Sequence, residues 1–301
     1  TSPPSPISYP ASPIMLFPHI TIVGAGLIGG SFALAARRAR LCEKITGWNG
    51  GHSLDEAIAR GIIDSIEEAF DQGEVCKADL IYLAAPVGGI IEFLKRYGRR
   101  IKPGAIITDA GSSKREIIKA AREHLSDEVI FIGGHPMAGS HNAGVEFAAA
   151  DLFIDAPYAI VIDEEKTSYA EAVDKVASLI RAIGARPVFL TAEDHDRIVA
   201  RVSHAPQLIS TALASALSKT LTEDAMKLSG RGLMDMTRLA ASQWSVWEDI
   251  LSSNADEIAQ ALDEAASEIK SLREAVATGD TKKAHDAFER ANQFAQKVNN
   301  K

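Results

Sequence analysis

Cysteine is scarce in this chain of 301 residues, which also has no excess of basic residues and no long apolar run. Two cysteines, Cys42 and Cys76, cannot build a disulfide framework, and they fit a reducing cytosol. Lysine and arginine total 32 against 40 acidic residues, so the formal net charge is −8. This excess of acid excludes the electrostatic footprint of a protein that binds nucleic acid or anionic membrane. Without about 18 consecutive apolar residues, no transmembrane helix is expected, and we expect a cytoplasmic protein.

The sequence also lacks a metal-ligand pattern and a secretory signal. No group of cysteine and histidine residues has metal-ligand spacing, so no metal site is expected. Residues 1–18 contain six prolines and little periodicity, and they lack the charged and apolar regions of a secretory signal. We therefore expect residues 1–18 to form a disordered, proline-rich arm.

Short apolar runs alternate with helical stretches from residue 19 to about residue 190, and this alternation predicts a doubly wound parallel sheet of the Rossmann type. The expected strands are 19–23, 44–48, 80–84, 105–108, 129–132, 158–162 and 187–190. The expected helices between them are 27–40, 53–60, 89–99, 114–124 and 168–183. From residue 191 to residue 301 the periodicity is helical, so the fold class is α/β with an all-helical C-terminal domain.

A G-x-G-x-x-G motif follows the first expected strand and opens the first expected helix, which is the context of a dinucleotide-binding turn. The first glycine permits a tight turn, the second lets the backbone approach a pyrophosphate, and the third allows close helix–strand packing. The amides and the dipole at the helix N-terminus then hold the anion. The residues expected to bind the cofactor here are Gly24, Gly26, Leu27, Ile28 and Gly29.

The end of the second expected strand normally carries an acid that binds the adenosine ribose. Asn49 occupies this place, and the loop around it has no carboxylate and no arginine. Asn49 can bind the ribose hydroxyls without repelling a 2′-phosphate, and His52 and Ser53 can help to bind that phosphate. The cofactor is therefore NAD or NADP, and the choice stays open.

A glycine-rich segment with a histidine, residues 133–140, follows the strand expected at 129–132. A histidine at the carboxyl end of a strand in a Rossmann sheet lies beside the cofactor cleft. Because its ordinary pKa is near 6.5, His135 suits the removal of a proton from an alcohol as hydride leaves. The alternative is a histidine that only hydrogen-bonds the loop backbone.

Five motifs in this order resemble the prephenate/arogenate dehydrogenase family of tyrosine biosynthesis, and the resemblance covers about residues 19–280. The motifs are Gly24–Gly29, Asp109–Lys114, Gly133–Gly139, Ser203–Gln207 and Asp235–Arg238. The resemblance implies an oxidative decarboxylation of prephenate or arogenate, which yields 4-hydroxyphenylpyruvate or tyrosine. It also implies hydride transfer to NAD or NADP, proton transfer to a base and loss of the ring carboxylate as CO2.

The resemblance assigns three residues to the reacting end of the substrate. His135 matches the catalytic base, and Ser112 matches a serine that hydrogen-bonds the same hydroxyl and the histidine. Pro86 matches a segment that lies against the cofactor. The alternatives are a helix N-cap for Ser112 and an ordinary loop proline for Pro86.

The resemblance also implies a set of substrate-binding residues. Arg238 matches the arginine that binds a substrate carboxylate, for which a guanidinium fork is suited. The alternative is a local ion pair with Asp235. His204 and Gln207 share one face of a helix and match a segment that holds the substrate, although His204 alone also fits a buried packing role. Ser140 matches a hydroxyl residue that follows the catalytic segment.

Two departures from the family pattern bear on substrate choice. Many members carry a second histidine where this chain has Gln207, and an acid commonly follows the hydroxyl residue where this chain has His141. These departures favour arogenate, or use of both substrates, over prephenate alone.

Two other functions are compatible with parts of this pattern. A β-hydroxyacid dehydrogenase usually has a catalytic lysine on the first helix after the domain boundary, and the helix expected at 194–217 contains none. A non-catalytic dinucleotide-binding protein would share the fold. His195 and Asp196 are interpreted as helix-start residues without a catalytic role.

The long amphipathic run at 248–277, together with the family resemblance, predicts a homodimer through the helical domain. We therefore expect a dinucleotide-binding domain at 19–190 and a helical domain for substrate binding and dimerisation at 191–301.

Overall fold

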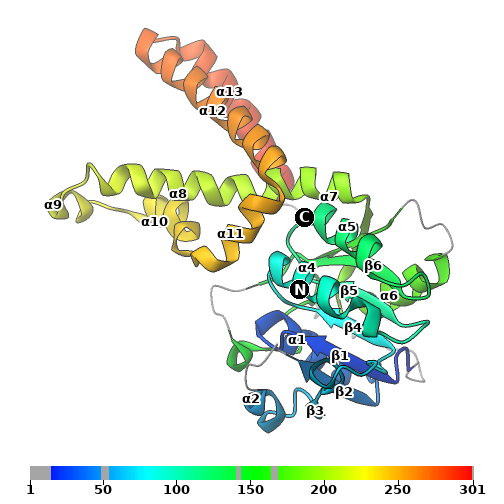
Figure 1. Ribbon diagram of the computed structural model, residues 1–301. Helices are drawn as coiled ribbons and strands as arrows, with labels where there is room; N and C mark the ends of the chain where they lie inside the picture. Colours follow the sequence, from blue (N-terminus) through cyan, green and yellow to red (C-terminus); the bar gives the residue numbers. More distant parts are fainter. Residues whose placement is uncertain (1–14, 49–53, 140–143, 164–168, 300–301) are drawn as a thin grey trace, which may run out of the picture. The chain divides into compact units, whose positions relative to one another are not determined.

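The computed structural model describes residues 15–48, 54–139, 144–163 and 169–299, and its contacts divide the chain into two compact units (Figure 1). The first unit contains the residues up to Val199 together with Ser242–Ser253, and the second contains Ala200–Ala241 and the residues from Asn254 onward. Residues 192–199, which the sequence analysis placed in the helical domain, therefore belong to the first unit.

The described strands of the first unit form one eight-stranded sheet in the order β3-β2-β1-β4-β5-β6-β7-β8. The strands are β1 His19–Val23, β2 Lys44–Trp48, β3 Ser65–Ile66, β4 Leu80–Leu83, β5 Ile106–Asp109, β6 Ile130–Pro136, β7 Pro157–Val161 and β8 Arg186–Leu190. The order 3-2-1-4-5-6 is that of dinucleotide-binding sheets, so the predicted Rossmann-type domain is confirmed.

The pairing of β6 with β7 differs from the expected all-parallel sheet, because these two strands are antiparallel. Parallel neighbours need a long crossover, usually a helix. Between Pro136 and Pro157 the described residues contain a 3-10 turn, Val145–Phe147, but no α-helix. The chain therefore returns along β6 and adds β7 in the opposite direction.

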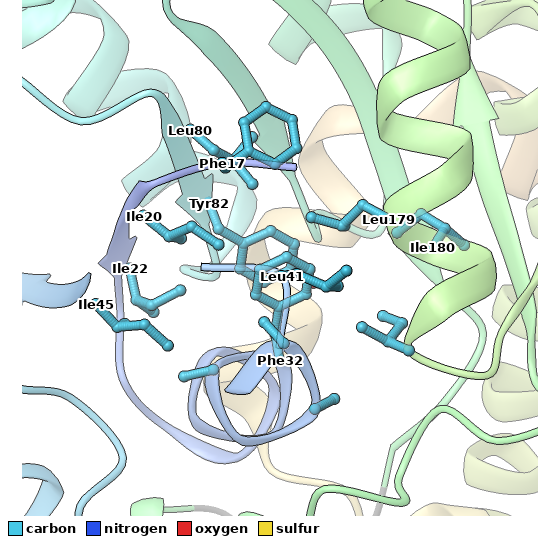
Figure 2. Close-up of a cluster of buried hydrophobic side chains, with 14 of the residues drawn as sticks. Phe17, Ile20, Ile22, Phe32, Leu41, Ile45, Leu80, Tyr82, Leu179 and Ile180 are labelled. Atoms are coloured by element: carbon cyan, nitrogen blue, oxygen red, sulfur yellow. The ribbon is translucent and has the colours of Figure 1, made fainter. Parts of the chain in front are cut away.

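Helices cover both faces of the sheet (Figure 1). Those of the first unit are α1 Leu27–Arg38, α2 Asp55–Ala59, α3 Ala69–Gln72, α4 Val87–Tyr97, α5 Arg115–His124, α6 Ala170–Ala182, α7 Ala192–Val199 and α11 Trp244–Ser253. On one face α1 and α6 pack on the sheet, where Phe32 stacks on Tyr82 with ring centroids 3.7 Å apart (Figure 2). On the other face α4 and α5 bury a second apolar cluster that includes Ile90, Phe93 and Ile117.

The described part of the second unit is all-helical, as predicted. Its helices are α8 Ala205–Ser218, α9 Glu223–Met226, α10 Arg231–Thr237, α12 Ala255–Thr278 and α13 Thr281–Asn299. A π-helix, Ala200–His204, precedes α8, and Pro206 lies in the first turn of α8. Because proline has no amide hydrogen, this position at the start of a helix is one that it tolerates. Across both units, no described helix combines the length and the apolar character needed to span a membrane.

Candidate active site

Strand ends from four parallel strands meet at one edge of the sheet. β1 pairs with β4 up to Val23 and Leu83, and β4 pairs with β5 up to Leu83 and Asp109. β6 runs parallel to β5 and continues past it to Pro136. This carboxyl edge is where ligands bind in open α/β sheets. The predicted site residues that follow these strand ends, or lie in the last part of β6, are Gly24, Pro86, Ser112 and His135.

The first and third glycines of the turn are required by packing. Gly24 has φ +92°, and a Cβ there would lie 2.5 Å from the carbonyl oxygen of Ala84. A Cβ on Gly29 would lie 2.1 Å from the carbonyl oxygen of Gly24. Side chains at these two positions would push α1 away from β1 and β4, so the turn holds its shape only with glycine.

The middle glycine faces open space, as a phosphate-binding turn needs. Gly26 is the N-cap of α1, and a Cβ placed on it would meet nothing within 4 Å. The half-buried Leu27 and Ile28 follow as the first residues of α1, whose amides have no partner within the helix. The turn therefore fits the pyrophosphate of a dinucleotide. Asn49, the predicted ribose contact, lies outside the described residues.

Pro86 and Ser112 follow β4 and β5. Pro86 is exposed at the N-cap of α4. Ser112 is half-buried, and α5 begins three residues later at Arg115 with Lys114 as its N-cap. The two backbone amides of Lys114 and Arg115 donate to the carboxylate of Asp196. Ser112 is therefore not the N-cap of this helix.

His135 lies within β6, although the sequence analysis ended this strand at Ile132. Residues Gly133–Pro136 pair with β7, and His135 lies opposite Ala159. This pairing keeps the backbone extended through the histidine, as the following Pro136 also favours. The side chain of His135 is held at the carboxyl edge with only 9% of the residue exposed.

A chain of hydrogen bonds extends from His135 into α7. The Nδ1 atom of His135 lies 2.9 Å from the Nε2 atom of His195, and the Nδ1 atom of His195 lies 2.8 Å from Oδ1 of Asp196. Asp196 also accepts the backbone amides of Lys114 and Arg115 at 2.7 and 3.0 Å. His195 and Asp196 are both fully buried. The histidine at the edge is thus connected to a carboxylate that is fixed by a helix N-terminus.

Burial and hydrogen bonding set the charges of this chain. Burial lowers the pKa of His195, and the hydrogen bond that His195 donates to Asp196 opposes that shift without cancelling it. Burial alone would raise the pKa of Asp196, but the hydrogen bonds from His195 and from the amide of Arg115 outweigh it and lower that pKa. His195 is therefore neutral and Asp196 is ionised near neutral pH.

A buried ion pair stabilises the loop that follows β5 at the same edge of the sheet. Lys114 Nζ is bonded to Oδ2 of Asp109, and both side chains are fully buried. Burial lowers the pKa of Lys114, and the carboxylate of Asp109 opposes this shift. The same carboxylate accepts the amide of Gly111 at 2.8 Å and that of Gly134 at 2.9 Å. Asp109 thereby fixes the loop after β5 against the residue that precedes His135.

His204 occupies the end of the π-helix in the second unit. It is buried, and its Nδ1 atom lies 3.4 Å from Nδ2 of Asn254. This environment is that of the packing alternative for His204, and its substrate contact stays a prediction. Ser140 lies outside the described residues.

Gln207 and Arg238 are brought together within the second unit. The Nε2 atom of Gln207 donates to the carbonyl oxygen of Leu239 at 2.7 Å. Leu239 follows Arg238, which is exposed at the C-cap of α10. Asp235 and Arg238 are both described, and no ion pair joins them. Gln207 therefore fixes the backbone beside an exposed guanidinium.

Comparison with known proteins identifies the family. Residues 32–189 match a family model described as the nucleotide-binding domain of prephenate dehydrogenase, and residues 191–290 match its dimerization domain. The chain belongs to the prephenate dehydrogenase family. The family resemblance predicted from the ordered motifs is thus confirmed.

Individual members of the prephenate dehydrogenase family match most of the chain. A prephenate dehydrogenase of Lactococcus lactis is 37% identical over 239 residues, which cover 78% of this chain and 64% of that protein. The chain thus spans less than two thirds of the length of this relative. A cyclohexadienyl dehydrogenase of Zymomonas mobilis is 32% identical over 271 residues, covering 88% of this chain and 90% of that protein.

Two solved structures show the same architecture. Prephenate dehydrogenase from A. aeolicus, in complex with hydroxyphenyl propionate and NAD+, superposes with a TM-score of 0.86 at 26% identity. The match covers 93% of this chain and 98% of that one. Synechocystis arogenate dehydrogenase has a TM-score of 0.79 at 27% identity and covers 93% of this chain and 99% of that one.

His195 and Asp196 form the hydrogen-bond chain behind His135, which the sequence did not predict. The sequence pattern indicated helix-start residues, but His195 and Asp196 lie on the buried face of α7 with Ala192 and Val199. The spacing 192, 195, 196 and 199 is that of a helix stripe facing a core. A histidine and an aspartate inside such a stripe are the signal that would have revealed them.

Proposed function

We propose that this chain catalyses the NAD(P)-dependent oxidative decarboxylation of prephenate, arogenate or both, giving 4-hydroxyphenylpyruvate or tyrosine. The observation that carries this proposal is the carboxyl edge of the sheet. There a glycine turn with open space at Gly26 follows β1, and a buried, hydrogen-bonded His135 lies in the last part of β6. Membership of the prephenate dehydrogenase family supports the reaction class.

Each residue at the carboxyl edge has a separate role in the proposed reaction. Gly24, Gly26 and Gly29 form the turn that would hold the pyrophosphate, and Pro86 would lie against the cofactor. The bound nicotinamide supplies the acceptor for the hydride that leaves the ring carbon. His135 accepts the proton of the ring hydroxyl, to which Ser112 donates a hydrogen bond.

The ring carboxylate then leaves as CO2, and its bonding electron pair makes the ring aromatic. The phenolate oxygen takes back the proton held by His135, so the base is restored in each turnover. The net change converts substrate and oxidised cofactor into phenol product, CO2 and reduced cofactor, with no proton left over.

Arg238 is assigned to a substrate carboxylate, with which its guanidinium can form two parallel hydrogen bonds. Its exposure and the hydrogen bond that Gln207 makes to Leu239 support this role, because the guanidinium is accessible and its backbone is fixed. We expect Arg238→Ala to raise KM for the substrate about 10- to 100-fold. Arg238→Lys would recover only part of this loss, because an ammonium is a point charge. An unchanged KM in Arg238→Ala would contradict the assignment.

We also infer a homodimer through the second unit. α12 and α13 carry large apolar side chains that are largely exposed in one chain, among them Val276, Phe288 and Phe294. The family model that covers this region is a dimerization domain. Light scattering at micromolar concentration should give the mass of two chains, and a monomer mass would contradict the inference.

Initial rates of nicotinamide reduction test the reaction itself. The purified chain is assayed with prephenate and with arogenate, each with NAD and with NADP. Turnover in any of the four combinations supports the reaction class, and the ratios between them report substrate and cofactor preference. Folded protein that is silent in all four combinations would overturn the proposal.

A further inference from the structure

We propose that His195 and Asp196 are positioning residues that fix the tautomer of His135, so that Nε2 of His135 is the atom that takes the substrate proton. The inference rests on the proposed function, since it explains how His135 is made ready for that step. Neither residue belongs to the motifs that carried the family resemblance.

The chain of donors and acceptors starts at the carboxylate. An ionised carboxylate can only accept hydrogen bonds. Oδ1 of Asp196 lies 2.8 Å from Nδ1 of His195, so this nitrogen carries the proton. The amides of Lys114 and Arg115 donate to the same carboxylate, and they prevent it from turning away from the ring.

The next hydrogen bond joins the rings of His195 and His135. Because His195 is neutral and its Nδ1 is protonated, its Nε2 has a lone pair. That atom lies 2.9 Å from Nδ1 of His135 and must accept a hydrogen bond from it. Nδ1 of His135 is therefore protonated, and its Nε2 has the lone pair that a general base needs.

The same hydrogen-bond chain stabilises the imidazolium that forms when His135 takes the proton. A protonated His135 carries a positive charge and donates from Nδ1 to His195, with the ionised Asp196 beyond it. The other charged groups that act on His195 are Lys114 on the α5 side and Asp109 of β5. These two are bonded to each other. Nε of Arg115 pairs with Oδ2 of Asp196 at 3.3 Å, while Oδ1 of Asp196 faces His195 and is the negative group nearest to the two rings.

Asp196 also links both residues that face the substrate hydroxyl. It reaches His135 through His195, and it caps the helix that follows the loop of Ser112. One buried carboxylate thus fixes the ring of the base and the end of the loop that carries the serine. This shared anchor is the reason that His195, rather than Asp196, is the residue to substitute.

The kinetic test compares two variants with a matched control. His195→Phe keeps a ring of similar size but removes both nitrogens, whereas His195→Gln keeps an amide oxygen that can accept from His135. His19→Gln is the control, since His19 is a hydrogen-bonded histidine at the start of β1 outside the machinery. We expect kcat to fall about 100-fold in His195→Phe, with KM for substrate and cofactor little changed.

The pH profile separates positioning from a structural role. In His195→Phe the acid limb of kcat should move to lower pH, because an imidazolium at His135 loses the support of Asp196. His195→Gln should recover much of kcat, and His19→Gln should retain both the wild-type kcat and the wild-type limb. A wild-type kcat and limb in His195→Phe would overturn the inference.

A second readout needs no turnover. Long-range ¹H–¹⁵N spectra of protein labelled at its histidine rings report which nitrogen of each ring is protonated. His135→Gln and His195→Gln assign the two signals among the eight histidines. We expect protonated Nδ1 in both rings, and a protonated Nε2 on neutral His135 would overturn the inference even in an active enzyme. Wild-type protein that is silent with every substrate contradicts the proposed function instead.

Discussion

Two histidine clusters lie at opposite ends of the same sheet, and only one of them has the features of a catalytic site. At the start of β1, Nε2 of His19 lies 3.0 Å from the hydroxyl of Thr46, which in turn lies 2.8 Å from that of Thr21. At the carboxyl edge, His135 is bonded to a second histidine. Burial lowers the pKa of His19, as it lowers that of His195.

The two clusters differ in how the histidine reaches a carboxylate. Around His19 the chain passes through the hydroxyl of Thr46, which donates to Oε2 of Glu67 at 3.2 Å. Oε2 of Glu67 lies 3.9 Å from the ring, beyond hydrogen-bond distance. Around His135 the chain ends in an ionised carboxylate held by two amides. Neither burial of a histidine nor a hydrogen-bond chain to a carboxylate is thus by itself the mark of function. His135 differs from His19 in its direct contact with a second histidine and in its place at the carboxyl edge, where ligands bind in such sheets.

The largest expected effect is the loss of the base itself. His135→Asn should lower kcat about 10²- to 10⁴-fold, because the proton of the ring hydroxyl loses its acceptor. The matched substitution His19→Asn should leave kcat within about a factor of two, since that ring lies at the start of β1. Steady-state rates with saturating substrate check both. Similar losses in the two variants would remove the distinction between the clusters.

The ion pairs at the two ends of the sheet should also differ in how much unfolding free energy is lost when the cation is removed. Lys114→Met leaves the buried carboxylate of Asp109 without its cation, which should cost about 3–5 kcal/mol of unfolding free energy. Lys102 pairs with Asp79 near the start of β4, where both side chains are about 30% exposed. Lys102→Met should therefore cost at most about 1 kcal/mol. Urea unfolding measures both values, and equal costs would show that the two pairs are equivalent.

Within the carboxyl edge, two glycines of the same turn should respond differently. Gly29→Ala places a Cβ against the Gly24 carbonyl and should cost about 1–3 kcal/mol of stability. Gly26→Ala meets no atom, and its φ of −82° suits any residue. Its stability should be near wild type, while KM for the cofactor rises because the methyl group lies where the pyrophosphate would bind. Thermal unfolding and cofactor titration of both variants check this contrast.

The fold and part of the site followed from local sequence patterns. The alternation of strands and helices, the glycine turn and the position of His135 each depend on residues close together in the chain. The extension of β6 to Pro136 did not follow, because it depends on antiparallel pairing with β7. Pairing partners of this kind are not encoded in the periodicity of either segment.

The supporting residues of the site were harder to predict because they lie far apart in sequence. His135 and His195 are 60 positions apart, and Lys114 and Asp196 are 82 apart. Only the packing of α7 on the rest of the first unit brings these groups into contact. The local pattern at the start of α7 is that of a helix start, and nothing in it indicates the contacts of His195 with β6 and of Asp196 with the start of α5.

The smallest expected effect is a difference in how stability depends on pH. Both His19 and His195 have a lowered pKa in the folded chain, whereas both rings titrate near 6.5 when unfolded. Below about pH 6.5 the unfolded chain therefore binds protons that the folded chain does not, and the unfolding free energy falls as the pH falls. Each ring contributes at most about 1.4 kcal/mol per pH unit.

His19→Gln and His195→Gln should each flatten this decline, and the double variant should flatten it most. Urea midpoints measured between about pH 7.5 and 5.5 give the slopes. Asp196 does not interfere in this range, because its lowered pKa makes its contribution disappear only at more acidic pH. The two rings are expected to act alike here, although they differ in catalysis, because burial lowers the pKa of both. If only His195→Gln changed the slope, the folded ring of His19 would have to titrate like an exposed histidine.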